Sequence, residues 1–327
     1  MPIFVISIAA SVLGLAVSQD KSIDSAPIKT LSVRKSTQTD VPIFSAFLPA
    51  RCDSAGDLYF QLGDSGSYNA GVVMRLQRDS NQPKLYKAPS DQSGGLAFSE
   101  FTVTPAGKVL LLEQTQAGGY EIIRFDSDKD EPTQTAIDSP KHLEATDFAA
   151  SESGVLMIGG YFDKHADAEL QGRAFVGFFG PGGKLIRDLN QESYVKLKEV
   201  RMSQHDGATT TGPDGNFYFA HASEVDVLSG YGDLVRTISI QKPDPDATVA
   251  AVAVTGDLLS LQFYKTDKSK TVHSMFLVMS PATGDLYSSY VPSPELGDNC
   301  VCFSGHSGYT FLRTEKGKLK FLSAPLS

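Results

Sequence analysis

One pattern recurs through this chain: a tight turn containing glycine, an apolar run, another turn and another apolar run. In residues 212–240, Asp214-Gly215 forms such a turn before the bulky β-forming run 216–220. Residues 224–229 and 234–240 then alternate polar and apolar side chains, as strands with one buried face do. Short connections join the three runs, so the stretch predicts an antiparallel meander.

The same unit occurs six times. The turn glycines that mark the units are separated by 41 to 61 residues and are Gly56, Gly107, Gly154, Gly215, Gly256 and Gly308. An apolar or small-residue stretch before each glycine supplies a first strand. Four strands at a period of roughly 40–50 residues are typical of propeller blades. Because one blade alone exposes both faces of its sheet, the blades must stack and close into a ring.

The last unit has only three strands before Ser327. Residues 27–33 form an extended, alternating segment that has no partner in the first unit. We therefore expect this segment to pair beside residues 318–324 and complete the last blade. The predicted architecture is an all-β, six-bladed β-propeller, closed by an N-terminal strand and formed by a single domain over residues 19–327.

Residues 212–240 resemble a blade of the NHL-repeat and related TolB-like six-bladed propellers. The resemblance rests on GPDGNFYFA, a second strand, a Gly-rich turn and LVRTI, and it extends to residues 105–126 and 152–189. Such repeats place an Asp, an Asn and an Arg after the second strand, whereas this chain has His221-Ala222-Ser223-Glu224 there. The resemblance implies a fold and, at most, a binding surface, because one fold serves many functions.

The N-terminal residues predict export. Residues 2–17 are apolar and uncharged, and the small residues Ala16 and Ser18 suit a cleavage site after residue 18. The run lacks a preceding Lys or Arg, and it is short for a membrane span of about 20 residues. We expect a signal peptide over residues 1–18, a secreted or periplasmic protein, and no stable membrane span after cleavage.

The charge balance argues against a nucleic-acid partner. The formal net charge is −9, and the basic residues are dispersed among acids rather than clustered. Binding a phosphate backbone needs a positive face that releases counterions. We expect a monomer with no nucleic-acid partner.

Candidate ligand-binding residues lie where loops enter the innermost strands of a propeller. Glu100 and Asp147 share a register, seven residues before their turn glycines. Other polar residues lie within about ten residues of theirs: Arg51, His205, Asp246, Asp298 and Asn299. Carboxylate and amide oxygens around a channel are ligands for Ca²⁺ or another hard divalent cation. Glu100 and Asp147 are therefore also the candidate metal ligands, and solvated loop residues are the alternative.

The three cysteines suggest a bridge across the ring. Cys52 lies on the first strand of the first unit, and Cys300 and Cys302 lie on the first strand of the last. These units are neighbours in a closed ring, and an exported protein meets an oxidising compartment. Alternation along a strand places both sulfurs of Cys-x-Cys on one face, so either could pair with Cys52. Three free core cysteines are the alternative.

These observations favour a binding or recognition module that engages a protein, peptide or glycan at one rim of the ring. A second hypothesis is a metal-dependent lactonase or esterase of the gluconolactonase type. No general base can be named for it, which weighs against an enzyme. A third hypothesis is a non-catalytic structural or sensor domain of an envelope assembly.

Overall fold

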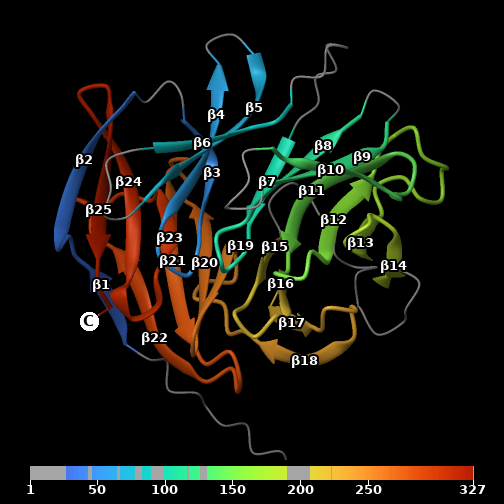
Figure 1. The fold of residues 1–327 in the computed structure, drawn as a ribbon. Coiled ribbons are helices and arrows are strands. Elements are labelled where there is room, and N and C mark those ends of the chain that lie inside the picture. Colours follow the sequence, from blue (N-terminus) through green and yellow to red (C-terminus); the bar gives the residue numbers. More distant parts are fainter. Residues whose placement is uncertain are drawn as a thin grey trace, which may run out of the picture.

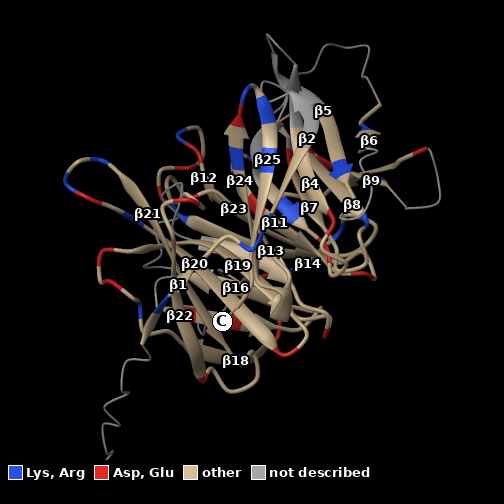
Figure 2. Ribbon diagram, turned by 90° about the vertical axis from the view of Figure 1, so that its left-hand side faces the viewer, with Lys and Arg blue, Asp and Glu red and all other residues tan. Residues whose placement is uncertain are grey.

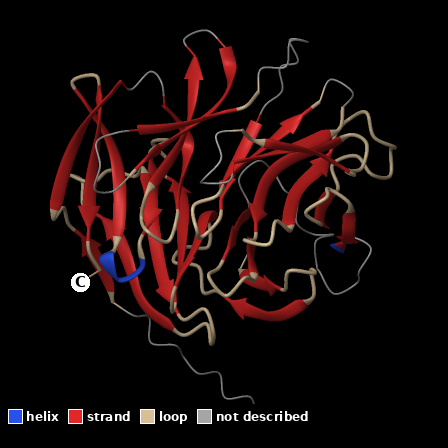
Figure 3. Cartoon of the chain, in the orientation of Figure 1, coloured by secondary structure: helices blue, strands red, loops and turns tan. Residues whose placement is uncertain are grey.

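The computed structural model describes residues 27–42, 46–64, 67–77, 83–89, 99–115, 118–125, 131–189, 207–221 and 223–326. The predicted signal peptide, residues 1–18, lies outside these ranges. Six sheets are arranged as blades around a central axis (Figure 1), and strands form the body of the molecule (Figure 3). A single turn of 3₁₀ helix, η4 (Gly305–Ser307), joins two strands of the last blade. Within the described ranges, no helix has the length and apolarity to cross a membrane.

Each blade begins with its innermost strand and proceeds outward by antiparallel pairing. The first blade contains β3 (Ala46–Cys52), β4 (Leu58–Asp64), β5 (Ser67–Leu76) and β6 (Pro83–Lys87). The second contains β7 (Ser99–Val103), β8 (Val109–Gln114), β9 (Tyr120–Phe125) and β10 (Thr133–Ile137). The third contains β11 (Leu143–Ala150), β12 (Leu156–Phe162), β13 (Ala174–Phe179) and β14 (Leu185–Asp188).

The other three blades repeat this order. The fourth contains β15 (Gly207–Thr211), β16 (Phe217–His221), β17 (Glu224–Leu228) and β18 (Leu234–Ser239). The fifth contains β19 (Thr248–Thr255), β20 (Leu258–Thr266), β21 (Val272–Met279) and β22 (Leu286–Pro292). The sixth contains β23 (Cys300–Phe303), β24 (Tyr309–Glu315) and β25 (Lys318–Ala324). The six predicted units therefore correspond to the six blades, and all six marker glycines have positive φ in the turn after the first strand.

Two segments from the start of the described chain add to the last two blades. β1 (Ile28–Leu31) pairs in parallel with β22, with Ile28 opposite Ser289. β2 (Lys35–Pro42) pairs antiparallel with β25, with Lys35 opposite Ser323. The prediction that residues 27–33 pair beside 318–324 is therefore wrong. Burial decides the placement of β1, because the Leu31 side chain is buried among apolar residues between the fifth and sixth blades.

The hydrophobic core is divided among the contacts between neighbouring blades. Each of six buried clusters joins side chains from two adjacent sheets, and one of them joins the first blade to the sixth. Alternation along the strands produces this division: Val109 and Leu111 face the first blade, whereas Leu110 and Leu112 face the third. Both faces of each sheet are thus buried by its neighbours, as stacking in a ring requires.

Two arginines each connect one blade to a turn of the next blade. The Arg124 guanidinium of β9 donates a hydrogen bond to the carbonyl of Gly154, and that of Arg236 on β18 donates to the carbonyl of Pro281 at 2.6 Å. Both acceptors lie in a hairpin turn of the following blade. These hydrogen bonds tie each blade to the one that follows it in the ring. Acidic and basic residues are otherwise interspersed around the ring (Figure 2).

Candidate functional site

The six innermost strands surround one cavity on the ring axis. Its volume is about 450 Å³, and residues of each inner strand line it. Figure 1 shows these inner strands arranged around the axis. The polar side chains around it are Arg51, Glu100, Thr102, Thr146, Asp147, Thr209, Thr210, Thr248, Ser260, Gln262, Tyr264, Cys300 and Tyr309. A concave site of this size with a few converging polar groups has the general form of a ligand pocket.

Bulges shape the wall of this cavity. β3, β11, β19 and β23 each show a register shift against the second strand of their blade. A bulge inserts an extra residue and redirects the side chains beside it. In β11 the shift lies between Ala145 and Asp147, opposite Gly160. A Cβ atom at Gly160 would lie 2.2 Å from the carbonyl oxygen of Glu144, so the bulge requires glycine there.

An ion pair crosses the cavity between the first and third blades. The Arg51 guanidinium lies 3.7 Å from one carboxylate oxygen of Asp147, and the two side chains are 29% and 12% exposed. The other Asp147 oxygen accepts the amide hydrogen of Thr209 at 2.6 Å. Burial raises the pKa of Asp147, and Arg51 and the hydrogen bonds from Thr209 oppose that shift. The Asp147 carboxylate is therefore compensated, although it lies away from water.

Glu100 on β7 lies between these two residues in the order of the blades. Burial raises its pKa to about 7, with Arg51 acting to lower the pKa and Asp147 to raise it further. Among the described residues, no hydrogen bond or ion pair reaches its carboxyl group. Glu100 is thus a partly buried acid whose proton is exchangeable near neutral pH and whose oxygens remain available.

The opposite side of the cavity is neutral. It is formed by the fifth and sixth blades, where the Ser260 and Tyr309 hydroxyl groups lie 2.8 Å apart. The Gln262 amide donates to the hydroxyl of Ser274 at 3.3 Å. Burial raises the pKa of Tyr264, which also lines this side, so its hydroxyl stays protonated. The cavity therefore presents charged groups on one side and hydroxyl and amide groups on the other.

The structure brings together three of the seven predicted channel residues: Arg51, Glu100 and Asp147. Asp246 is exposed in the loop before β19 and does not line the cavity. Asp298 accepts the amide hydrogen of Ser274 at 2.7 Å, also away from the cavity. Asn299 is exposed, and its backbone carbonyl accepts the amide hydrogen of Leu312. His205 lies outside the described residues.

Sequence reasoning missed the neutral wall. Thr209 and Thr248 lie on inner strands whose sequences, GATTT and TVAAVAVT, are rich in small residues. Small side chains are what a strand needs when six of them approach a common axis, and this composition was the available signal. Ser260, Gln262 and Tyr264 lie on a second strand, β20, and carried no comparable signal.

The candidate metal ligands Glu100 and Asp147 both line the cavity. Within the described ranges, no group of three or more His, Cys, Asp or Glu residues is arranged to hold a metal ion. Ca²⁺ takes six to eight oxygen ligands, whereas here Arg51 already pairs with one of two carboxylates. The described side chains alone do not form a calcium cage, and metal binding stays a prediction.

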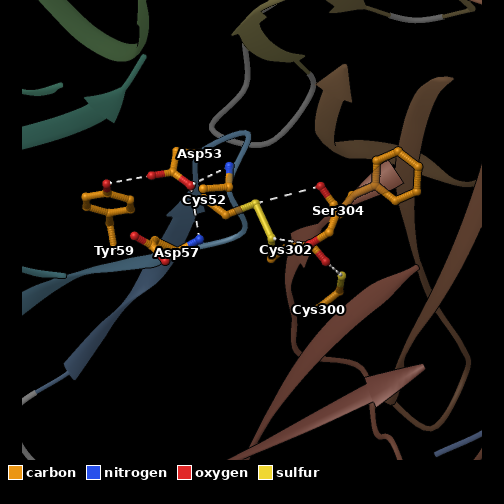
Figure 4. Close-up of a disulfide and its surroundings, with 9 residues drawn as sticks. Cys52, Asp53, Asp57, Tyr59, Cys300, Cys302 and Ser304 are labelled. Carbon is orange, nitrogen blue, oxygen red and sulfur yellow. Dashed lines mark hydrogen bonds between the residues drawn. A yellow bond between two sulfur atoms is a disulfide. The ribbon is translucent and has the colours of Figure 1, made fainter. Parts of the chain in front are cut away.

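A disulfide joins the first and last blades beside the cavity. Cys52 on β3 is bonded to Cys302 on β23, with a Cα–Cα distance of 5.6 Å (Figure 4). Cys300 is a free thiol that donates towards the carbonyl of Cys302, and burial raises its pKa to about 12. The bulge between Cys300 and Cys302 interrupts the alternation expected for Cys-x-Cys, so the two sulfurs are not equivalent.

Comparisons with known proteins identify the fold. A luciferin-regenerating enzyme has a solved structure similar to this chain, with a TM-score of 0.50, 10% identity, and coverage of 90% of this chain and 97% of that one. The chain is a six-bladed β-propeller. A propeller match at 10% identity shows the fold alone.

Two further solved structures are more distant from this propeller. They are a protein of unknown function from Bacteroides caccae (TM-score 0.40, 12% identity, 78% of each chain) and a gluconolactonase from Xanthomonas campestris (TM-score 0.36, 10% identity, 84% of this chain and 71% of that one). No protein-family model matches the sequence, and no curated protein matches it.

Proposed function

We propose that this protein is an exported, monomeric binding module of the NHL-like or TolB-like kind. Its ligand, a segment of a protein, a peptide or a glycan, enters the axial cavity from one rim of the ring. The observation that carries the proposal is the Arg51–Asp147–Glu100 group in the wall of the 450 Å³ cavity. Concave sites with a few fixed polar groups are where proteins of this architecture bind ligands.

The fold accounts for only part of these charges, because Asp147 accepts the Thr209 amide hydrogen whereas no hydrogen bond from a described residue reaches Glu100. Taking charged groups out of water is costly, and apolar replacements of a buried ion pair are often neutral or stabilising. The inner strands of the fourth to sixth blades line the same cavity with small neutral residues such as Thr209, Ala251 and Cys300. The charged group on the first three blades is therefore better explained by a ligand than by packing.

The described cavity residues favour binding over catalysis. A nucleophilic thiol or hydroxyl needs a neighbouring base or a lowered pKa. Burial raises the pKa of the Cys300 thiol to about 12, which disfavours the thiolate. The Ser260 hydroxyl is engaged with Tyr309, not with an acid or a histidine. Glu100 is the one described group at the cavity whose pKa, about 7, suits acid–base chemistry.

The test is a binding screen of the purified protein against peptide and glycan panels, followed by variants. Asp147→Asn and Arg51→Gln are each expected to weaken binding of the selected ligand by about tenfold or more, because each disrupts a desolvated charge pair. Asp246→Asn is the matched control, because it makes the same chemical change at an exposed site off the cavity. Equal affinity in all three folded variants would contradict the proposal.

The metal-dependent hydrolase is tested with the same protein. Calcium is titrated while the melting temperature and the hydrolysis of simple lactones and esters are followed. The binding proposal predicts no metal-dependent turnover. Turnover that requires Ca²⁺ and disappears in Glu100→Gln would replace it with the hydrolase.

A further inference from the structure

A second cavity opens beside the axial one. It has a volume of about 250 Å³ and lies between the second and third blades. Glu100 and Thr146 line both cavities, so the two spaces share a wall. Glu144, Tyr120 and Tyr161 form much of the rest of this side groove.

The backbone of the side groove is held in place by Tyr120. Its hydroxyl donates to the carbonyl of Leu143 at 2.9 Å and accepts the amide hydrogen of Ala145 at 3.0 Å. These bonds bracket Glu144 immediately before the β11 bulge. The Tyr120 hydroxyl is thus occupied by hydrogen bonds to the backbone, and the Tyr120 side chain forms part of the groove wall. The groove is thus a built feature of β9 and β11 rather than a gap between loops.

Charge is unbalanced along the two cavities. Of the described residues that line them, three are carboxylic acids and one, Arg51, is a cation. Arg51 already pairs with Asp147. Among the described residues, no cation pairs with Glu100 or Glu144, and these are the two acids that face the side groove. The groove therefore offers two carboxyl groups and two phenol rings, and the one cation that acts on Glu100, Arg51, lines the axial cavity and is paired with Asp147.

We propose that the side groove binds the cationic end of the ligand, an ammonium or guanidinium group such as that of a lysine or arginine side chain. Glu100 and Glu144 accept its hydrogen bonds, and the rings of Tyr120 and Tyr161 contact its stem. Hydrogen bonds between ionised groups are the strong ones, and phenol faces attract cations. This inference rests on the proposed function and specifies the class of ligand: a peptide with a basic residue rather than a neutral glycan.

Proton release accompanies binding in this arrangement. The other titratable groups that line the two cavities are Arg51, Asp147, Glu144, Tyr120, Tyr161, Tyr264, Tyr309 and Cys300, and of these Arg51 and Asp147 act on the pKa of Glu100. Burial raises the pKa of Glu100 to about 7, so its carboxyl group is partly protonated at neutral pH. A cation beside it favours the ionised form. Affinity for a basic peptide is therefore expected to rise from pH 6 to pH 8, with release of up to one proton.

The experiment compares two tripeptides that differ only in charge: acetyl-Gly-Lys-Gly-amide and its norleucine analogue. Calorimetry at pH 8 is expected to give affinity for the lysine peptide about tenfold higher than for the norleucine peptide. Glu144→Gln and Glu100→Gln are each expected to remove most of this preference. Asp257→Asn is the control, because the Asp257 side chain is 75% exposed in the turn after β19.

The outcomes separate the inference from the proposed function. Equal affinity for the two peptides, or a lysine preference that survives Glu144→Gln and Glu100→Gln, would overturn the side groove as a cation site. Absence of lysine-peptide binding at millimolar concentration would overturn it as well. In each case, a ligand from the panels whose binding still depends on Arg51 and Asp147 would leave the axial binding module standing.

Discussion

The two sides of the axial cavity are built on the same kind of strand but differ in charge. β3, β7 and β11 contribute Arg51, Glu100 and Asp147, whereas β15, β19 and β23 contribute threonine, alanine and cysteine. The other three blades therefore form their inner strands with small neutral residues at the corresponding positions. The difference is the reason we propose that the first three blades contact the ligand.

Elsewhere in the ring, two groups of polar side chains are paired with each other. Asp53, in the turn after β3, accepts hydrogen bonds from the Tyr59 hydroxyl at 2.8 Å and from the Asp57 amide at 3.0 Å. In the fourth blade, the His221 ring nitrogen Nε2 lies 2.9 Å from one carboxylate oxygen of Asp226. The other oxygen of that carboxylate accepts a hydrogen bond from the Thr237 hydroxyl. Such satisfied networks hold a structure together. Glu100, by contrast, has no such partner among the described residues, which is what a ligand-facing group looks like.

The largest expected effect is at the seam where the charged and neutral sides meet. Cys52→Ser or Cys302→Ser opens a loop with a sequence separation of 250 and should lower the free energy of unfolding by about 2–5 kcal/mol. Cys300→Ser, which leaves the bridge intact, should cost about 1 kcal/mol or less. Urea unfolding measures all three. A thiol assay of the denatured wild-type protein should find one free thiol, and three would contradict the bridge.

A smaller effect is expected on the pH dependence of stability, which should differ between variants of the charged side and of the neutral side. The pKa of Glu100 is raised from 4.5 to about 7, so protonated Glu100 contributes stability that is fully present below pH 4.5 and lost as the pH rises through 7. At pH 8, Glu100→Gln should therefore be more stable than the wild type by about 1–2 kcal/mol, a figure reduced for partial exposure.

The corresponding neutral-side control is Gln262→Glu, which introduces an acid opposite Glu100. It should be less stable than the wild type at pH 8 and recover as the pH falls to 5. Thermal unfolding between pH 4 and pH 8 measures both variants. A wild type and a Glu100→Gln variant with the same pH dependence would show that Glu100 is not held in its neutral form.

The smallest effects are expected away from both sides of the cavity. Asp246→Ala and Asn299→Ala change exposed side chains that do not line it. Each should alter stability by less than about 0.5 kcal/mol and leave ligand affinity unchanged. A loss of binding in either variant, measured beside Asp147→Asn, would extend the site onto the rim.

The sequence predicted the ring because the turn and strand patterns that mark each blade are local. Turn glycines such as Gly215 and Gly256 need positive φ, and the strands between them alternate. It did not predict the position of β1, because alternation in residues 27–33 identifies a strand but not which sheet edge accepts it. Both β22 and β25 offered such an edge, and the burial of Leu31 decided between them.

The candidate site was predictable only in part, for a similar reason. Glu100 and Asp147 were found because each lies the same number of residues before its turn glycine. Asp246 and Asp298, which were chosen by a looser criterion, do not line the cavity. Bulges change how many residues separate a loop from its turn, and a bulge also makes Cys302 rather than Cys300 the partner of Cys52. These register shifts depend on contacts such as that of Gly160 with Glu144, which a single sequence does not reveal.

The central claim is that the charges on the first three blades serve a ligand and not the fold. The variant Arg51→Met with Asp147→Asn removes both charges but keeps an oxygen that can accept the Thr209 amide hydrogen, and its melting temperature and ligand affinity are measured together. We predict a melting temperature equal to or above that of the wild type, with affinity for the panel-selected ligand at least about tenfold lower. A destabilised double variant that still binds the ligand as the wild type does would contradict it.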